Sequence, residues 1–390
     1  MLSVLASLER RYKFSLDALL ILSKVLSIKE LEMYLEAVRE PGSLYYLRVN
    51  TLKASREEVI GMLKEEGVVA HPSRVLEDAV YVRVSGPFEV KPVGKSVYAD
   101  KAAAEAVYLG ANLYAPGVKK APKVRCGDLV TVYNPLGEPV ATGIAEMDGD
   151  EMETRDSGLA VRVVRSVYKV PSVRETGAFK RGLVYDQSLP AMLSVAALGP
   201  EPGWLVVDLC AAPGGKATYA AQLMGDEGRV VAVDRSPAKV RRMEENIARM
   251  GLKSVKTVVA DSRYLDLSPI VDQADAVIVD PPCTALGVRP KLYYERKWHE
   301  LVAAQLYQRQ FLRVAARIVK KGGRVLYSTC TVTWDENEGI VLWAERLGLR
   351  PVPHRPFIGT CSLAYLQRFY PHIHDQPGFF IAILEKVDGC

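Results

Sequence analysis

The sequence is poor in the residues that build metal centres, disulfide frameworks and membrane spans. Its 390 residues include only six cysteines and five histidines, and no two cysteines form a Cys-x-x-Cys pair. This scatter argues against a zinc ribbon or a disulfide framework and fits a reducing compartment. His372 and His374 lie one residue apart but have no third ligand near them in sequence, so we predict that the protein holds no metal.

Long apolar runs are also absent. No segment approaches the ~20 apolar residues that a membrane helix needs. The first residues, MLSVLASLERRYKF, contain only a brief apolar stretch before Glu9, Arg10 and Arg11, unlike a signal peptide. We therefore expect a cytoplasmic protein with no membrane partner, and we expect it to be a monomer.

The charge and length of the chain set wide bounds on its function. A net charge of +5 permits a polyanionic partner, although an ordinary mixed-charge surface explains it equally well. The length suffices for two or three domains. We divide the chain into an N-terminal helical and RRM-like region at 1–89, a small β-rich domain at 90–170 and an α/β domain at 171–390.

The first two regions differ in their hydrophobic period. Residues 15–40 carry apolar side chains at helical spacing, followed by a strand at 45–51, a helix at 55–66 and a strand at 79–84. Short β-rich runs at 129–133, 140–144 and 159–164, between Gly, Pro and Asp turns, predict a small barrel or sandwich. A nearby basic cluster fits a solvated loop or an RNA-contacting edge equally well. It comprises Lys119, Lys120, Lys123 and Arg125.

In the third region, strand and helix patterns alternate. We predict strands at 204–208, 229–233, 256–260, 276–280 and 323–327, and helices at 216–224, 237–250 and 299–320. This alternation is typical of a doubly wound α/β sheet with helices on both faces. In such a sheet, ligands bind beyond the carboxyl ends of the strands, where the strand order reverses.

A glycine-containing loop follows the first strand of this sheet. Gly214 and Gly215 allow the backbone to approach a ligand closely, and acids follow the next three strands, at Asp234, Asp261 and Asp280. An acid about 20 residues past such a loop typically holds ribose hydroxyls, and Asp261 is placed to accept from an adenine amino group. We therefore predict a nucleoside cofactor. The loop residues assigned to it are Cys210, Ala211, Ala212, Pro213, Gly214, Gly215 and Lys216.

Two thiols also follow predicted strands, Cys283 in Asp280-Pro-Pro-Cys283 and Cys330 in Ser328-Thr-Cys330. A thiolate adds readily to carbon 6 of cytosine and so activates carbon 5 toward an electrophile. Free cysteine is only about 3% thiolate at neutral pH, so the site must stabilise the ionised form. A carboxyl group such as Asp280 could protonate the ring nitrogen N3. These arguments predict cytosine 5-methylation but leave open which thiol attacks.

The motifs resemble those of the Nop/Sun-domain RNA cytosine-5 methyltransferases over residues 171–387. The matching segments are Asp208–Lys216, Asp280–Gly287, Tyr327–Thr331 with Asp335–Glu338, and Arg368–Pro371 with Gly378–Ala382. Arg48-Val-Asn-Thr-Leu-Lys53 resembles the region that precedes this domain. The resemblance implies a Rossmann-like methyltransferase sheet that binds S-adenosylmethionine through Cys210–Lys216, Asp234, Asp261 and Asp280. It also implies that Cys330 is the nucleophile and that Cys283 assists release of the methylated base.

The middle region resembles a PUA domain, a small RNA-binding barrel. The resemblance rests on segments 110–118, 127–132 and 140–145, and it implies a tRNA substrate with a cytosine near the acceptor end. The RNA 3′ end would then lie near the Gly-Ala…Pro-Gly element, with Tyr114 as a stacking ring. The candidate substrate contacts are Gly110, Ala111, Asn112, Tyr114, Pro116, Gly117, Lys119 and Lys120.

Three other interpretations remain. The enzyme could act on ribosomal RNA, or on DNA, although DNA cytosine methyltransferases rely on the Pro-Cys thiol and Cys330 would then be unexplained. A non-enzymatic RNA-binding assembly factor would not need every catalytic position to be filled. We therefore expect an enzyme with RNA as its partner.

Overall fold

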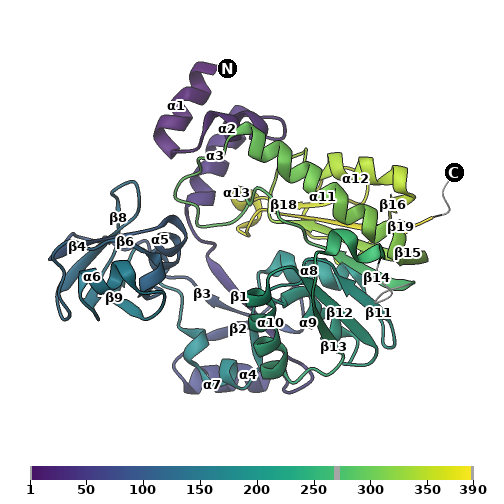
Figure 1. The fold of residues 1–390 in the computed structure, drawn as a ribbon, viewed down its shortest axis with the longest axis horizontal. Helices are drawn as coiled ribbons and strands as arrows, with labels where there is room; N and C mark the ends of the chain where they lie inside the picture. Colours follow the sequence, from purple (N-terminus) through teal and green to yellow (C-terminus); the bar gives the residue numbers. More distant parts are fainter. Residues whose placement is uncertain (1, 268–272, 388–390) are drawn as a thin grey trace.

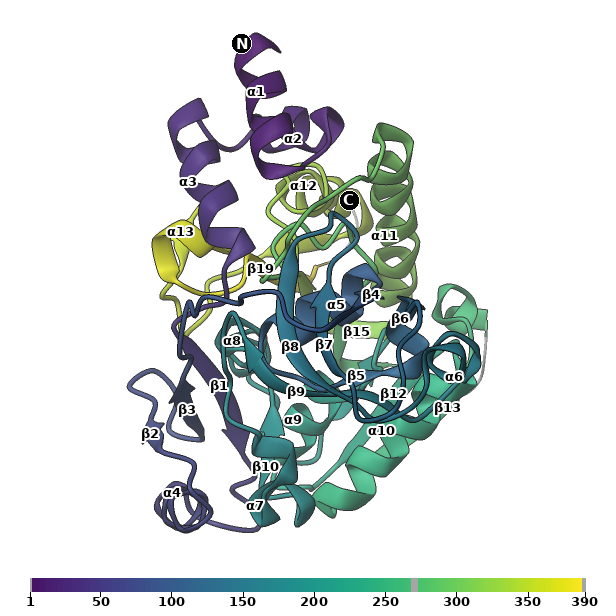
Figure 2. The ribbon, with the colours of Figure 1, turned by 90° about the vertical axis from the view of Figure 1, so that its left-hand side faces the viewer.

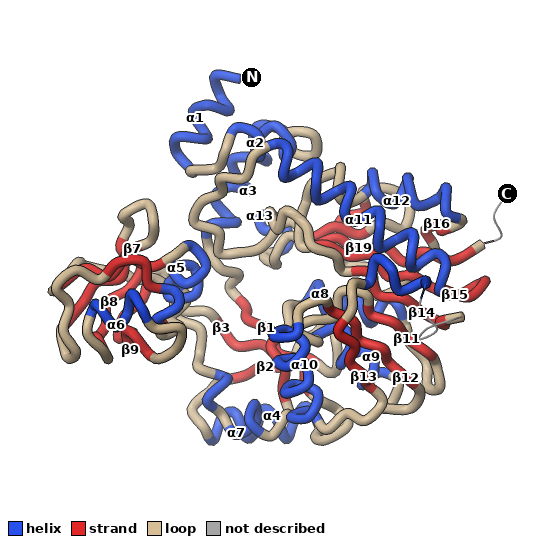
Figure 3. Tube along the Cα trace, in the orientation of Figure 1, coloured by secondary structure: helices blue, strands red, loops and turns tan. Residues whose placement is uncertain are grey.

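The computed structural model describes residues 2–267 and 273–387, which form three sheets and an N-terminal group of helices. Figure 1 shows a small β domain on one side, the large α/β sheet on the other, and a four-stranded sheet below and between them. The tube view draws the strands of these sheets in red and the helices in blue (Figure 3). In the described part of the chain, no helix is both long and apolar enough to span a membrane.

The N-terminal helices are α1 (Leu2–Tyr12), α2 (Leu16–Leu22) and α3 (Ile28–Arg39). Ser27 begins α3 with a capping box, in which its hydroxyl accepts from the Glu30 amide and the Glu30 carboxylate accepts in return. The apolar faces of these helices pack against Leu286 and Val332, which follow the two cysteine motifs. The helices therefore cover the loops that carry the thiols.

The four-stranded sheet has the order β10-β1-β3-β2. Its elements are β1 (Leu44–Val49), α4 (Arg56–Glu65), β2 (Ala70–Pro72), β3 (Ala79–Arg83) and, beyond the barrel, η2 (Val173–Glu175), α7 (Gly177–Lys180) and β10 (Val184–Asp186). Strand β10 pairs antiparallel with β1, so a segment that we had grouped with the α/β domain completes the N-terminal sheet. A three-residue strand carries too little periodicity to reveal its partner in the sequence.

The strands of the small β domain form one sheet with the order β5-β9-β8-β7-β4-β6. Its elements are β4 (Lys95–Ala99), α5 (Lys101–Tyr108), β5 (Leu113–Tyr114), η1 (Ala115–Gly117), β6 (Val118–Lys120), β7 (Leu129–Tyr133), β8 (Pro139–Ala145), α6 (Gly149–Thr154) and β9 (Leu159–Ser166). Its apolar core also takes in Leu292 and Tyr293, from the segment after the first cysteine motif. Figure 2 looks onto this domain.

The large sheet has the order β13-β12-β11-β14-β15-β19-β18-β17, and β16 pairs with β19. Its strands are β11 (Leu205–Asp208), β12 (Arg229–Asp234), β13 (Val255–Val259), β14 (Ala274–Val279), β15 (Val319–Thr329), β16 (Leu349–Pro351), β17 (Thr360–Cys361), β18 (Gln367–Phe369) and β19 (Phe379–Lys386). The first five are parallel, as we predicted. The antiparallel end formed by β16–β19 was not predicted.

Both faces of the large sheet are covered by helices. One face packs on α8 (Leu189–Leu198), α9 (Gly215–Leu223) and α10 (Pro237–Met250), and the other on α11 (Trp298–Ile318) and α12 (Glu338–Ala344). Val206 belongs to the first apolar core and the next residue, Val207, to the second, because successive side chains of a strand point to opposite faces. Burial on both faces explains the continuous apolar runs in the sequence. The remaining short helices are η3 (Ser262–Leu267), η4 (Glu345–Leu347) and α13 (Pro371–His374).

Candidate functional site

Four acids lie at the carboxyl ends of adjacent parallel strands. Asp208 ends β11 and Asp234 ends β12, while Asp261 and Asp280 follow β13 and β14. The strand order reverses between β11 and β14, where ligands bind in open α/β sheets. The structure thus brings the predicted cofactor residues to the predicted edge.

Gly214 and Gly215 each occupy a position where a side chain would meet a neighbouring residue. Gly214 has a φ of 103° at the start of α9, and a Cβ there would lie 2.9 Å from Cγ of Met243. A Cβ on Gly215 would lie 3.3 Å from Cε1 of Tyr185. The loop is therefore pressed against α10 on one side and against β10 on the other.

A cavity of about 240 Å³ opens beside this loop. Its walls include Asp208, which is 1% exposed, and burial raises the pKa of this carboxyl to about 7. A small polar cavity bounded by acids and by a glycine loop fits the amino-acid end of a nucleoside cofactor such as S-adenosylmethionine. The lining residues are Tyr185, Asp186, Gln187, Ser188, Ala191, Asp208, Cys210, Ala211, Ala212, Pro213, Gly215, Lys216 and Asp280.

Sequence reasoning missed the part of this wall that comes from residues 185–191. These residues belong to β10 and the start of α8, ahead of the glycine loop in the chain. The pairing of β10 with β1 carries them to the mouth of the cavity. No pattern within the segment itself identifies it as part of a binding site.

Asp234 and Asp261 lie outside the wall of that cavity. The Asp234 carboxylate accepts from the amide of Ser236 at 2.9 Å, which fixes its orientation at the start of α10. Asp261 forms an ion pair with Arg263, whose Nη2 lies 2.5 Å from Oδ2. The guanidinium of Arg263 in turn lies 5.0 Å from the centre of the Tyr307 ring.

The two cysteine motifs bring their sulfurs together. Sγ of Cys283 and Sγ of Cys330 are 3.3 Å apart, although 47 residues separate them in the chain. The hydrogen bond from the Cys283 thiol lowers the pKa of Cys330, against the effect of burial, and the charges of Lys216 and Lys291 act in the same direction. The same hydrogen bond, together with burial, raises the pKa of Cys283 well above its usual value. Cys330 is thus the thiol with the more stable thiolate.

An ion pair lies between the cofactor cavity and the thiols. Nζ of Lys216 is 2.5 Å from Oδ2 of Asp280, and the other carboxylate oxygen accepts from Oγ of Ser328 at 3.0 Å. Although burial opposes it, the Asp280 carboxylate raises the pKa of Lys216, which is therefore charged at neutral pH. The pair presents an ammonium donor and a carboxylate acceptor close to Cys330.

The buried carboxylate of Glu336 joins the two cysteine loops. It accepts from the backbone amide and the hydroxyl of Thr284, from the Gln308 amide and from the hydroxyl of Thr333. Thr284 follows Cys283, and Thr333 lies three residues after Cys330. Glu336 is part of the Asp335–Glu338 segment quoted above, but its role as a clamp emerges only from these contacts.

The predicted RNA contacts fall into two places. Gly110, Ala111, Asn112 and Tyr114 line a groove of about 750 Å³ between the small β domain and the segment that follows it, and Tyr114 is 57% exposed. The same groove is lined by Arg162, Lys169 and Arg174, which the sequence analysis did not single out.

The other predicted contacts lie outside the groove wall. Pro116 and Gly117 form η1, where a Cβ on Gly117 would lie 2.5 Å from Cβ of Ala103, so this glycine serves close packing. Lys119 and Lys120 are exposed on β6, whereas Tyr114 ends β5, and these two strands stand at opposite ends of the strand order.

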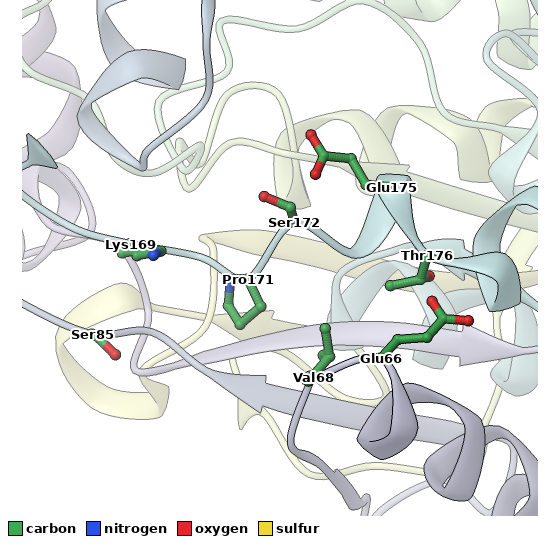
Figure 4. A pocket seen from close by; sticks show the side chains of 9 residues that line it. Glu66, Val68, Ser85, Lys169, Pro171, Ser172, Glu175 and Thr176 are labelled. Atoms are coloured by element: carbon green, nitrogen blue, oxygen red, sulfur yellow. The ribbon is translucent and has the colours of Figure 1, made fainter. Parts of the chain in front are cut away.

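A second hollow, of about 540 Å³, lies on the linker between the small β domain and α7 (Figure 4). Lys169, Pro171, Ser172 and Glu175 line both this hollow and the groove. The Glu66 carboxylate at its edge accepts from the amide of Gly177 at 2.8 Å. This contact ties the linker to the N-terminal sheet.

The two histidines that raised a metal interpretation are held by other groups. Nδ1 of His374 accepts from the backbone amide of Tyr370 at 2.9 Å, and His372 packs edge-on against the rings of Tyr34 and Tyr370. Among the described residues, no group of three or more His, Cys, Asp or Glu side chains could hold a metal ion.

Comparison with known protein families matches most of the chain in three segments. Residues 195–385 match the 16S rRNA methyltransferase RsmB/F model, residues 95–167 match the PUA domain, and residues 29–89 match the ferredoxin-like domain of RsmF/B-like methyltransferases. These three segments contain most of the large sheet, of the small β domain and of the four-stranded sheet, respectively.

Similar proteins match over nearly the whole chain. A tRNA (cytosine(72)-C(5))-methyltransferase of Pyrococcus horikoshii is 45% identical over 92% of this chain and 93% of its own. The human tRNA (cytosine(72)-C(5))-methyltransferase NSUN6 is 30% identical over 88% of this chain and 83% of its own. The crystal structure of NSun6 from Pyrococcus horikoshii with SFG superposes with a TM-score of 0.89, at 43% identity, and covers 97% of this chain and 99% of that one.

Proposed function

Because this chain belongs to the Nop/Sun-domain RNA cytosine-5 methyltransferases, we propose that it methylates carbon 5 of a tRNA cytosine, the one at position 72 near the acceptor end. The observation that carries the proposal is the pair of sulfurs 3.3 Å apart beside a cofactor cavity, in a chain that also has a PUA domain. The similarity to tRNA-modifying proteins extends through the PUA domain, which favours tRNA over ribosomal RNA.

Cys330 acts as the nucleophile. Its thiolate is stabilised by the Cys283 thiol and by two lysine charges, and it adds to carbon 6 of the base. The electron pair of the carbon 5–carbon 6 bond then makes carbon 5 nucleophilic. S-adenosylmethionine, when bound, supplies the methyl group that carbon 5 takes up.

Cys283 serves the release step. Once carbon 5 carries the methyl group, its proton must leave and the bond between carbon 6 and Sγ of Cys330 must break. Bonding of Cys330 to carbon 6 removes the hydrogen-bond acceptor and the charge that raise the pKa of Cys283, so Cys283 can lose its own proton to water. Its thiolate then takes up the proton from carbon 5, whose electron pair re-forms the double bond to carbon 6 and expels Cys330 as a thiolate.

Lys216 and Asp280 hold the polar edge of the base. Cytosine offers two acceptors, O2 and N3, and one donor, the exocyclic amine. The Lys216 ammonium donates to the acceptors and offsets the negative charge that thiolate addition places on the ring, while the Asp280 carboxylate accepts from the amine. Their ion pair holds both groups at the site before the base arrives.

The cofactor is held by the loop Cys210–Lys216 and by residues 185–188, with Asp234 at the ribose and Asp261 at the adenine. RNA, rather than DNA, enters from the groove lined by Gly110–Tyr114. All these groups come from one chain, which supports a monomer. The five free cysteines of the described residues fit a reducing compartment such as the cytoplasm.

Bisulfite sequencing of total tRNA, incubated with the protein and with or without S-adenosylmethionine, tests the proposal. We expect one cytosine at position 72 to become protected only when the cofactor is present. If a cytosine of ribosomal RNA is protected instead, the substrate is ribosomal RNA and not tRNA. Protection of neither RNA would favour the RNA-binding assembly factor.

A further inference from the structure

Arg48, on β1 of the N-terminal sheet, is buried to 0% exposure inside the contact with the large sheet. Burial lowers its pKa to about 10, so the guanidinium is charged at neutral pH. No described carboxylate forms a direct ion pair with it, although the charge of Asp78 acts on it from further away. A buried cation with no carboxylate in direct contact is costly, and its position calls for a reason other than simple packing.

Four acceptors receive the hydrogen bonds of this guanidinium, the weakest being Sδ of Met250 at 3.5 Å from Nη2. Nη1 donates to Oε1 of Gln187 and to the backbone carbonyl of Gly215, both at 2.7 Å, and Nη2 donates to Oγ1 of Thr218 at 2.8 Å. The planar group also lies between two rings, 5.0 Å from the centre of Tyr185 and 4.9 Å from that of Tyr219. The forked geometry of arginine reaches these acceptors together, which a lysine cannot do.

Two of these acceptors belong to the cofactor site itself, Gly215 to the loop and Gln187 to the cavity wall. Gly215 is the first residue of α9, and the hydroxyl of Thr218 donates onward to the carbonyl of Gly214 at 2.7 Å. The hydroxyl of Tyr185 donates to the carbonyl of Pro213 at 3.3 Å. The backbone of the glycine loop is therefore tied to the N-terminal sheet at successive residues.

We propose that Arg48 is a positioning residue for the cofactor: it holds the glycine loop in the shape that binds S-adenosylmethionine, so that the N-terminal sheet is part of the cofactor site. The inference rests on the proposed methyltransferase function. It gives the N-terminal sheet a task beyond any contact with RNA.

A general loosening of the contact between the two sheets is the competing explanation. Arg249 provides a matched control, because it also crosses this contact. Its Nη1 donates to the carbonyls of Phe179 and Val184, at 2.6 and 3.1 Å. It makes no direct hydrogen bond to the glycine loop, which it reaches only through Asn246. Arg249→Lys therefore weakens the same interface and leaves the direct hydrogen bonds between Arg48 and the loop in place.

Isothermal titration calorimetry with S-adenosylmethionine on the full chain, in the absence of RNA, separates these explanations. We expect Arg48→Lys to raise the Kd for the cofactor about tenfold or more, because two hydrogen bonds of a charged group are lost. Thr218→Val, which removes one acceptor of Arg48 and the donor to the Gly214 carbonyl, should raise it about threefold to tenfold. Arg249→Lys should leave it within about twofold.

Steady-state kinetics supply a second readout. A positioning role predicts that the KM for S-adenosylmethionine rises in Arg48→Lys and Thr218→Val while the KM for tRNA is unchanged. Equal weakening by Arg249→Lys would contradict the proposal, as would unchanged binding in Thr218→Val. If Arg48→Lys does not fold, Thr218→Val decides the question alone. No cofactor binding by the unmodified protein would contradict the proposed function itself, and this inference with it.

Discussion

At the scale of single residues, the two thiols have different environments, and replacing them should have different effects on the reaction. We expect Cys330→Ala to abolish turnover, because burial still raises the pKa of the neighbouring Cys283 thiol once its hydrogen bond to Cys330 is gone, and so disfavours the nucleophilic thiolate. Cys283→Ala should still allow addition and methyl transfer, but it should trap the RNA on Cys330, since the release step loses its base. A denaturing gel of protein mixed with labelled tRNA reads out the adduct, and free turnover by Cys283→Ala without an adduct would contradict its release role.

The pH dependence of Cys330 follows from the charges around it. Lys291 is 5% exposed, and burial together with Lys101 lowers its pKa to about 8. While charged, Lys291 helps to lower the pKa of Cys330. Lys291→Met should therefore raise the pKa of Cys330 and move its thiolate formation to higher pH.

The rate of iodoacetamide alkylation at Cys330, followed by mass spectrometry from pH 5 to 10, measures this shift without RNA. Lys320→Met is the control, because Lys320 is exposed and pairs with Asp275 on the other end of the sheet. An unchanged alkylation profile in Lys291→Met would show that the lysine does not act on the thiol.

At the scale of elements, the relative position of the two cysteine loops depends on Glu336. Glu336→Ala would remove the acceptor of four buried donors, of which the Thr284 hydroxyl and the Gln308 amide keep contacts with Thr331 and Pro282. We expect it to lower the free energy of unfolding by about 3 kcal/mol. Turnover should fall as well, because the loops that set the distance between the sulfurs lose their link. Urea unfolding and tRNA methylation measure the two effects, and Glu345→Ala, at an exposed position of η4, is the control. If Glu336→Ala is as stable as Glu345→Ala, then Glu336 does not hold the two cysteine loops together.

The prediction of elements from the sequence succeeded for most of the long patterns in the α/β domain, although it missed the eight-residue strand β19. The five parallel strands and the helices α9, α10 and α11 have periodic or fully apolar runs that burial on both faces of the sheet requires. The short strand β10 and the antiparallel strands β16–β18 have two or three residues each, too few for a period. Their positions depend on partners far away in the chain.

At the scale of the whole molecule, we propose that a tRNA held by the small β domain reaches the thiols of the large sheet. The groove of Gly110–Tyr114 includes Lys169, whereas Lys119 and Lys120 lie on another strand, outside the groove wall. We expect Lys169→Glu to raise the KM for tRNA and to flatten its dependence on salt, because a phosphate contact is replaced by repulsion.

The double variant Lys119→Glu, Lys120→Glu tests whether the RNA also contacts β6. We expect it to raise the KM for tRNA and to reduce the salt dependence as well. An unchanged salt dependence would assign these two lysines to a solvated face. The KM for S-adenosylmethionine should stay the same in both variants, since the cofactor cavity is built from other residues.

The sequence by itself determined the order of the motifs, the α/β alternation, the thiol pair and the acids at strand ends, because each is written in contiguous residues or in a local period. Only the tertiary structure decided which thiol is the better thiolate, since that depends on a sulfur 47 residues away and on two lysines. It also decided that Arg48 meets Gly215, 167 residues along the chain, and that Lys119 lies outside the groove. Electrostatics and packing act across space, and the distances that govern them are absent from the linear pattern.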